Sequence, residues 1–248
     1  FDPGPPDGIF GPRTAEAVRT FQGSAGLKPS GFVGEPTWEA LAGSPQEFAV
    51  PANFLPKPQG VLKIIINTYD RTLTLYADNK AYRIYGVAVG YPETPSQTGD
   101  WKIVTKRRNW GNGFGSRWMQ LSVPYGAYGI HGTNKPWSIG TATSLGCIRM
   151  LNPDVEELYD WVDEGTPVEI VGPPPVLPDW AKTTYKRGAK GWEIVAIQFG
   201  LRDQGFYAGP ADGLFGPEME QAVKLFQKAK GLPQDGVITR KMILMMGL

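Results

Sequence analysis

Cysteine and histidine are almost absent from this sequence, which has one of each, Cys147 and His131, among 248 residues. A single cysteine excludes a disulfide within the chain. One Cys and one His leave only carboxylates to complete a metal site, and this is a poor ligand set for structural zinc. We therefore expect neither a metal nor another cofactor, and each of the two residues needs its own explanation.

An excess of charge is absent as well, because 25 Lys and Arg residues stand against 24 Asp and Glu residues. Proteins that neutralise a run of phosphates carry a basic excess, so we do not expect nucleic acid as a partner. The longest apolar runs, around residues 64–66 and 85–89, fall far short of the roughly 18 residues that predict a membrane span. The chain starts at Phe1 without a basic and apolar leader, which indicates a removed signal or a fragment.

The composition is that of folded domains rich in turns. Hydrophobic residues make up 41% of the chain and charged residues 20%, which is enough apolar material for an ordinary core. With 32 Gly and 23 Pro, the chain has more turn-forming residues than average, which favours many turns between short strands.

The two ends of the chain repeat each other. Residues 1–34 align without a gap on residues 206–239, and about fifteen of the 34 aligned positions are identical. In each copy a DGxFGP turn leads into a helix with proline in its first turn, where the missing N–H costs nothing. Apolar residues then follow helical spacing in both copies, as Val18 and Phe21 do in the first and Val223 and Phe226 in the second.

A further helix is expected only in front of the C-terminal copy. A periodic apolar segment runs from Trp192 through Ile194, Ile197 and Leu201 and predicts a helix, and the N-terminal copy has no counterpart to it. We therefore expect the N-terminal copy to be a truncated unit that is loosely packed or dependent on a neighbouring surface.

Proline-rich segments separate these ends from the middle and predict five parts. They are a truncated repeat over residues 1–43, a linker over 44–60, a central domain over 61–171, a linker over 172–184 and a C-terminal module over 185–248.

The central domain is expected to be mainly β, with small all-α modules at both ends. Apolar, β-branched or alternating segments predict strands over residues 62–67, 72–76, 81–89, 118–123, 125–131 and 166–171. One helix interrupts them: Asn152 is predicted as its cap, Pro153 as its first residue, and an apolar stripe follows until Gly165 ends it.

The lone histidine and the lone cysteine both fall in the central domain. A thiol and an imidazole form the pair needed for nucleophilic acyl transfer, in which the His takes the proton and the sulfur attacks a carbonyl. A neighbouring imidazolium would lower the pKa of Cys147 and make the thiolate dominant. Taken singly, a buried Cys or a lone His is more often structural. Their coincidence in a glycine-rich segment favours catalysis.

The neighbours of Cys147 suggest supporting roles. Gly146 lets the backbone turn closely around the sulfur and leaves N–H groups free to face an oxyanion. Arg149 alternates with Cys147 along an extended segment, so its guanidinium is expected on the same face. Three nearby aromatic residues either wall a cleft or belong to ordinary strand core: Trp118, Tyr125 and Tyr128.

These segments resemble the catalytic motif of bacterial L,D-transpeptidases. The similarity is carried by HGTN at 131–134, SIG at 138–140 and SLGCIRMLN at 144–152, and it extends over about residues 61–171. The position before Gly146, often His in that family, is Leu145 here. The DGxFGP turns of the end copies are similar to the small helical peptidoglycan-binding module of cell-wall enzymes.

The resemblance implies an L,D-transpeptidase-like β-sandwich with a short helix and a cysteine-dependent reaction. Cys147 would attack the carbonyl before the terminal D-alanine of a tetrapeptide stem, so that D-alanine leaves and a thioester forms. An amine of a neighbouring stem would then take the acyl group and complete a cross-link. His131 would act as base and then as acid, oriented by the backbone carbonyl of Gly132.

The resemblance also implies how the substrate is held and where the protein acts. N–H groups near Gly146 and Cys147 would form an oxyanion hole, and Arg149 and Ser144 would position the donor stem. The implied partners are peptidoglycan stem peptides and glycan strands, with carbapenem β-lactams as covalent inhibitors. The implied location is extracytoplasmic, at the cell wall.

Two alternatives stay open at this point. In an L,D-carboxypeptidase of the same mechanism, water resolves the thioester in place of an amine. In a non-catalytic wall-binding protein, the central domain performs no chemistry.

Overall fold

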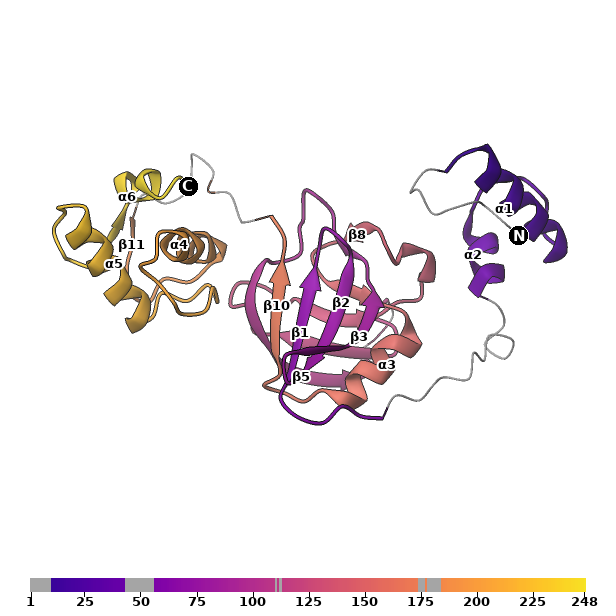
Figure 1. Cartoon of the computed structure of the whole chain (residues 1–248), viewed down its shortest axis with the longest axis horizontal. Coiled ribbons are helices and arrows are strands. Elements are labelled where there is room, and N and C mark those ends of the chain that lie inside the picture. Colours follow the sequence, from indigo (N-terminus) through magenta and orange to yellow (C-terminus); the bar gives the residue numbers. More distant parts are fainter. Residues whose placement is uncertain (1–9, 43–55, 110, 112, 174–176, 178–183) are drawn as a thin grey trace. The chain divides into compact units, whose positions relative to one another are not determined.

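The computed structural model describes residues 10–42, 56–109, 111, 113–173, 177 and 184–248 (Figure 1). Most of the two predicted linkers lies outside the described residues, and so does the first part of the N-terminal DGxFGP turn, at 7–9. The chain forms two compact units, one of residues 1–56 with 135–137 and one of residues 57–134 with 138–248. Each unit is described by itself.

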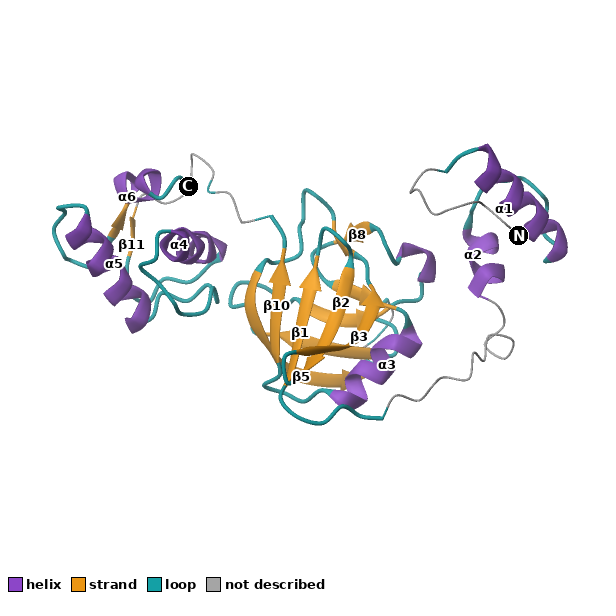
Figure 2. Cartoon of the chain, viewed as in Figure 1, coloured by secondary structure: helices purple, strands orange, loops and turns teal. Residues whose placement is uncertain are grey.

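The central domain is built on one eight-stranded sheet, which curls into a near-barrel (Figure 2). Its order is β3-β2-β1-β10-β5-β6-β7-β9, in which β1 pairs with β10 and β7 with β9 in parallel. The predicted mainly-β class is confirmed. The strands are β1 (Leu62–Asn67), β2 (Thr72–Ala77), β3 (Lys80–Gly86), β5 (Gly99–Arg108), β6 (Arg117–Leu121), β7 (Gly129–Gly132), β9 (Ile148–Met150) and β10 (Pro167–Val171). A second, two-stranded sheet joins β4 (Val89–Gly90) to β8 (Ala142–Ser144).

The core of this domain follows from the alternation of apolar residues in the strands. Ile64 and Ile66 of β1 lie opposite Leu75 and Leu73 of β2, and all four side chains are completely buried. Alternate residues of a strand share one face, so this register places the apolar face of the sheet toward the interior. Helix α3 (Asn152–Trp161) packs against β6 and β7, and a 3₁₀ turn, η1, covers Pro136–Ser138.

Several predicted boundaries differ in the structure. The segment predicted as one strand over 81–89 is divided into β3 and β4, and residues 125–128 form a loop before the short strand β7. The prediction of Asn152 as the helix cap is wrong, because Leu151 is the N-cap and Asn152 is the first helical residue. The side chain of Asn152 is instead used in a contact with the loop before β6, described below.

The longest strand, β5, was not among the predicted ones. It has the sequence GDWKIVTKRR, in which only Gly99, Trp101 and Ile103 are buried and the second half is basic and exposed. A register shift between Ile103 and Thr105 interrupts its pairing with β6. Because a bulge shifts the alternation of a strand, the alternation of buried and exposed residues ends at the start of the basic segment. The sequence pattern therefore did not predict this strand.

The C-terminal module has a compact core between two helices. Helix α4 (Trp192–Asp203) and helix α5 (Pro217–Ala229) bury Ile197, Leu201, Val223 and Phe226 completely. A short helix α6 (Arg240–Met245) and the strand pair of β11 (Thr184–Tyr185) with β12 (Ile238–Thr239) complete it. The helix predicted from the pattern around Trp192 is therefore confirmed.

Two buried glutamines hold the Asp-Gly turns of this module. Gln227 binds the turn at 235–237: its amide nitrogen donates to the Asp carboxylate at 2.7 Å and to the Val carbonyl at 3.0 Å, and its oxygen accepts the glycine N–H at 2.9 Å. Gln198 binds the turn at 212–214 in the same way. Since one amide satisfies three groups of each turn, these Asp-Gly segments are structural, as the interpretation of DGxFGP as a turn expects.

The N-terminal copy consists of helix α1 (Pro12–Ser24) and helix α2 (Glu35–Ala42). Val18 and Phe21 of α1 are only half-buried, whereas their counterparts Val223 and Phe226 are completely buried. Gln22 is buried and accepts the N–H of residue 31 at 2.9 Å, as Gln227 does in the other copy. The looser packing expected for this copy therefore agrees with its burial, while its polar framework is kept.

Two searches of the described ranges gave no candidate. No helix in them is long and apolar enough to cross a membrane. No group of three or more His, Cys, Asp or Glu side chains in them is placed to hold a metal ion.

We predict that Gln227→Met lowers the local stability of the C-terminal module. The thioether cannot replace the amide, so the N–H and carbonyl of the 235–237 turn lose their partners, at a cost of about 2 to 3 kcal/mol. Hydrogen exchange of the α5 amides measures this free energy of opening. The same substitution at the exposed Gln221 of α5 is the control and should stay within about 0.5 kcal/mol of the parent. Equal effects at both positions would contradict the role of the amide.

Candidate active site

The pairing of β7 with β9 brings the lone histidine and the lone cysteine to one face of the sheet. In this parallel pair, Ile130 lies opposite Ile148 and His131 opposite Arg149. Paired residues share a face and alternate along each strand, so the two isoleucines point into the core and His131 and Arg149 to the other side. Cys147 directly precedes β9 and, two residues before Arg149, falls on that same side. The strands lie about 4.8 Å apart, so His131 and Arg149 are direct neighbours, and Cys147 lies diagonally across from His131, next to Gly129.

A row of aromatic rings borders His131. Trp118 of β6 lies opposite His131, and the two rings stack with their centroids 5.7 Å apart. Phe114 meets the imidazole edge-on at 5.0 Å. His131 is only 3% exposed and Trp118 4%. Trp118 is therefore a core residue that also contacts His131, so it combines the strand-core position expected as one interpretation with a place beside the candidate site.

The imidazole is oriented by the next residue of its own strand. Nδ1 of His131 lies 2.6 Å from the carbonyl oxygen of Gly132, which is the contact expected from the sequence. A carbonyl oxygen can only accept, so Nδ1 carries the proton. In the neutral ring the lone pair is then on Nε2, and a proton acceptor requires such a lone pair.

The backbone around Gly132 is held by a residue whose role the sequence did not reveal. Oδ1 of Asn152 accepts the N–H of Ser116 at 3.1 Å, and a Cβ atom at either Gly115 or Gly132 would come within 2.3 Å of that oxygen. Only glycine at both positions permits this approach. Asn152 thus fixes the loop before β6 against the strand that carries His131. In the sequence, the only signs of this contact are the motif segments that contain Gly132 and Asn152. Their approach to each other depends on the fold.

Cys147 is half-buried, and its sulfur interacts with the backbone of β7. The Gly129 backbone donates a hydrogen bond to it, which lowers the pKa of the thiol. Gly129 stands two residues before His131 on the same strand. A Cβ atom there would lie 2.7 Å from the Trp118 ring, so glycine is needed for the close packing of this corner. Gly129 was not recognised as a site residue from the sequence.

The turn before Cys147 is closed by hydrogen bonds of Ser144. Gly146 has φ +108°, a conformation that favours glycine, and its N–H donates to Oγ of Ser144 at 3.1 Å. Oγ of Ser144 in turn donates to the carbonyl of Cys147 at 2.5 Å. The Gly146 N–H is therefore not free for an oxyanion. Ser144 is only 1% exposed, and its hydroxyl shapes the turn before Cys147.

Burial keeps both members of the pair uncharged at neutral pH. Burial lowers the pKa of His131 to about 4, and the positive charge of Arg149 lowers it further. Hydrogen bonds to the carbonyls of Gly132 and Phe114 act in the opposite direction. Burial also raises the pKa of Cys147, against the Gly129 hydrogen bond and the charge of Arg149. The expected resting thiolate and imidazolium are therefore wrong for this structure. Arg149 acts on both groups, as its place beside them requires.

Tyr125 and Tyr128 lie in the loop that precedes β7. Both are half-buried, and their rings meet edge to face with centroids 6.5 Å apart. A Cβ atom at Gly146 would lie 2.7 Å from Cε1 of Tyr128, so this ring rests on the nucleophile turn. Of the three aromatic residues named from the sequence, Tyr128 is the one that borders Cys147.

Proteins similar in sequence to this chain include L,D-transpeptidases. Residues 62–170 match the family model described as "L,D-transpeptidase catalytic domain". A protein of Bacillus subtilis (strain 168), "Putative L,D-transpeptidase YkuD", is 42% identical over 136 residues, which cover 54% of this chain and 80% of the relative. The chain belongs to the L,D-transpeptidase family. The protein of the same name in Bacillus licheniformis is 45% identical over 108 residues, which are 44% of this chain and, at 64%, slightly less than two thirds of that relative.

The ends of this L,D-transpeptidase family member match a second model. Residues 1–41 and 190–246 correspond to the "Putative peptidoglycan binding domain", as the repeat predicted, which associates the protein with the cell wall. Among solved structures, the crystal structure of an L,D-transpeptidase from Mycobacterium tuberculosis H37Rv is 20% identical with a TM-score of 0.40. The match covers 45% of this chain and 58% of that one.

We predict that alkylation of Cys147 by iodoacetamide has no titration step near neutral pH. Because burial raises the pKa of the thiol, the second-order rate should increase continuously from pH 6 to pH 9 without reaching a plateau. Measurement on the reduced full chain is direct, since the sequence has no other cysteine. A plateau that begins below pH 7.5 would indicate a resting thiolate and contradict the neutral pair.

Proposed function

We propose that this protein is a cysteine-dependent L,D-transpeptidase that cross-links peptidoglycan stem peptides. The observation that supports this most strongly is the β7–β9 register, which sets Cys147, His131 and Arg149 on one face. The hydrogen bond from Nδ1 to the Gly132 carbonyl adds an oriented base. A nucleophile, a base beside it and a group that fixes the base are the elements of nucleophilic acyl transfer.

The first half-reaction forms a thioester. Cys147 passes its proton to Nε2 of His131 as the sulfur attacks the carbonyl carbon between the third stem residue and the terminal D-alanine. The tetrahedral intermediate then collapses, the C–N bond breaks, and the proton on Nε2 goes to the departing amine of D-alanine. Because both groups are neutral at rest, charge separation occurs only when the substrate carbonyl is there to accept the negative charge.

The second half-reaction transfers the acyl group. The side-chain amine of a third residue in a neighbouring stem attacks the thioester carbonyl and gives its proton to Nε2 of His131. The C–S bond breaks, and the proton returns to the sulfur of Cys147. An amide between two stems and a free enzyme result, with atoms and charges balanced.

Arg149 and a backbone donor complete the proposal. We assign Arg149 to the negative charge of the donor stem or of the developing oxyanion, because its charge already acts on both His131 and Cys147. With the Gly146 N–H occupied by Ser144, the N–H of Cys147 itself is the donor that we assign to the oxyanion.

The end modules supply the attachment to the wall in this proposal. Both match the peptidoglycan-binding model, and the C-terminal copy has the complete core. We therefore assign binding of glycan strands and stems to the C-terminal copy first, and an extracytoplasmic location to the protein.

A carbapenem should form one covalent adduct with this protein. The lactam carbonyl is attacked as the stem carbonyl is, but the ring-opened acyl group stays attached to the sulfur, so intact mass should increase by one carbapenem per chain. Peptide mapping should place the adduct on Cys147, and Cys147→Ser should abolish it. Folded, reduced protein that gains no mass would contradict the proposal, and adduct formation excludes the non-catalytic alternative.

Purified muropeptides distinguish cross-linking from trimming. We expect dimers to accumulate when tetrapeptide monomers are incubated with the protein, and Cys147→Ala to give none. Mass spectrometry of the products provides the measurement. If only tripeptide monomers and free D-alanine appear, water resolves the thioester, and the L,D-carboxypeptidase alternative is correct.

A further inference from the structure

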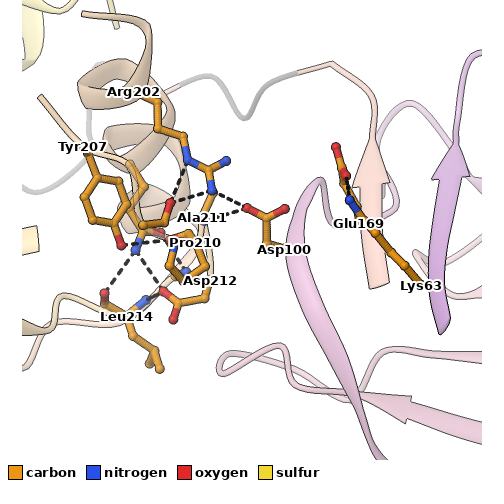
Figure 3. A network of polar contacts seen from close by, with 12 residues as sticks. Lys63, Asp100, Glu169, Arg202, Tyr207, Pro210, Ala211, Asp212 and Leu214 are labelled. Atoms are coloured by element: carbon orange, nitrogen blue, oxygen red, sulfur yellow. Dashed lines mark hydrogen bonds and ion pairs between the residues drawn. The ribbon is translucent and has the colours of Figure 1, made fainter. Parts of the chain in front are cut away.

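The C-terminal module contacts the catalytic domain through a polar network centred on Asp100 of β5 (Figure 3). The backbone N–H of Asp100 donates to the carbonyl of Ala211 at 3.0 Å, and its Oδ2 accepts the N–H of Ala211 at 2.9 Å. The same oxygen pairs with Nη2 of Arg202 on α4 at 2.5 Å. Arg202 also donates to the carbonyl of Gly209, so one guanidinium joins the strand to a loop of the module.

The backbones approach each other too closely for a loose contact. Ala211 is completely buried, and a Cβ atom at Gly99 would lie 2.6 Å from its carbonyl oxygen. Gly99 has φ +148°, which also favours glycine. Close packing of the Gly99 backbone against the buried backbone of Ala211 is typical of a fixed interface. A module held only by a flexible linker would not require glycine at this position.

Next to this network the module covers Tyr125. A Cβ atom at Gly213 would lie 3.1 Å from Cε1 of Tyr125, so the turn at 212–214 sits on the tyrosine ring. On the other side Trp101 meets the ring edge-on at 6.3 Å. Burial raises the pKa of Tyr125, and so do Tyr128 and Glu193 of α4, in agreement with the contact to Gly213 of the module. Tyr125 is thus clamped between β5 and the module.

The clamp continues to the nucleophile. Tyr125 packs against Tyr128, whose ring rests on Gly146. Two causes raise the pKa of Tyr128: burial is the larger, and the nearby Cys147 is the second. A continuous line of contacts therefore runs from the 212–214 turn through two tyrosines to the turn that carries the sulfur.

We propose that the C-terminal module is a fixed part of the active site, docked by Asp100, and that Tyr125 is a positioning residue through which the module holds Tyr128 over Cys147. In this arrangement the module restricts access of water to the sulfur as well as binding the wall. The consequence for acyl transfer rests on the proposed function; the docking and its effect on the sulfur do not.

The sheet itself offers a matched pair of variants. Asp100 of β5 lies directly opposite Glu169 of β10, with side chains 31% and 36% exposed. Each carboxylate forms one ion pair, but the partner of Glu169 is Lys63 of β1, at 2.6 Å inside the catalytic domain (Figure 3). Asp100→Ala therefore removes the side-chain contacts to Arg202 and Ala211, whereas Glu169→Ala, at the border of the same pocket, removes an ion pair of similar exposure within the catalytic domain.

Two measurements on the reduced full chain test the proposal without any substrate. Hydrogen exchange at the residue-100 amide, which donates to Ala211, reports docking and should lose about tenfold or more of its protection in Asp100→Ala. The pH–rate profile of Cys147 alkylation by iodoacetamide reports cover over the sulfur. We expect it to shift to lower pH, with rates at pH 8 raised about threefold or more, in Asp100→Ala and Tyr125→Ala. Glu169→Ala and the conservative Tyr125→Phe should match the parent.

Three results would overturn the proposal. Unchanged protection at residue 100 in Asp100→Ala would show that Asp100 does not dock the module. Lost protection with a parental alkylation profile would show that docking does not reach the sulfur. An equal shift of the alkylation profile in Glu169→Ala would show that the effect comes from a general loss of stability and not from docking of the module. Absence of carbapenem adducts, in contrast, would count against the proposed function and leave these two measurements interpretable.

Discussion

The parallel pairing of β7 with β9 is the constraint on which the rest of the site depends. These strands are three to four residues long, and their register decides whether Cys147 and His131 share a face. A shift by one residue would move each side chain to the opposite face and bury Arg149 in place of Ile148. The free-energy cost of exposing two isoleucines and burying a guanidinium fixes the register. The hydrophobic core on one face of these strands therefore determines the geometry of the site on the other face.

The features that could be predicted from the sequence are those with a local signal. The C-terminal DGxFGP turn, the proline at the start of the helices and the apolar stripe of α4 are each readable within about a dozen residues, and the structure contains them. The lone thiol and imidazole were found because they had no competitors, and the contact of Nδ1 with Gly132 needed only adjacent residues.

The features that could not be predicted depend on contacts between distant segments. Strand β5 alternates only in its first half, because a bulge interrupts it where the basic second half begins. The interaction of Asn152 with Ser116 spans 36 positions, and the use of the Gly146 N–H by Ser144 appears only once the turn is folded. Protonation is the least local property of all, since burial by several strands sets the pKa of His131 and of Cys147.

The neutrality of the resting pair has a consequence for the lifetime of the sulfur. Peroxides oxidise a thiolate far faster than a thiol, and a half-buried, protonated Cys147 offers little of the reactive form. A permanently ionised nucleophile would be converted to sulfenic acid wherever oxidants are present and no reductant follows. Because the thiol is the form of Cys147 that an oxidant meets at neutral pH, its conversion to sulfenic acid is slow even where no reductant is at hand.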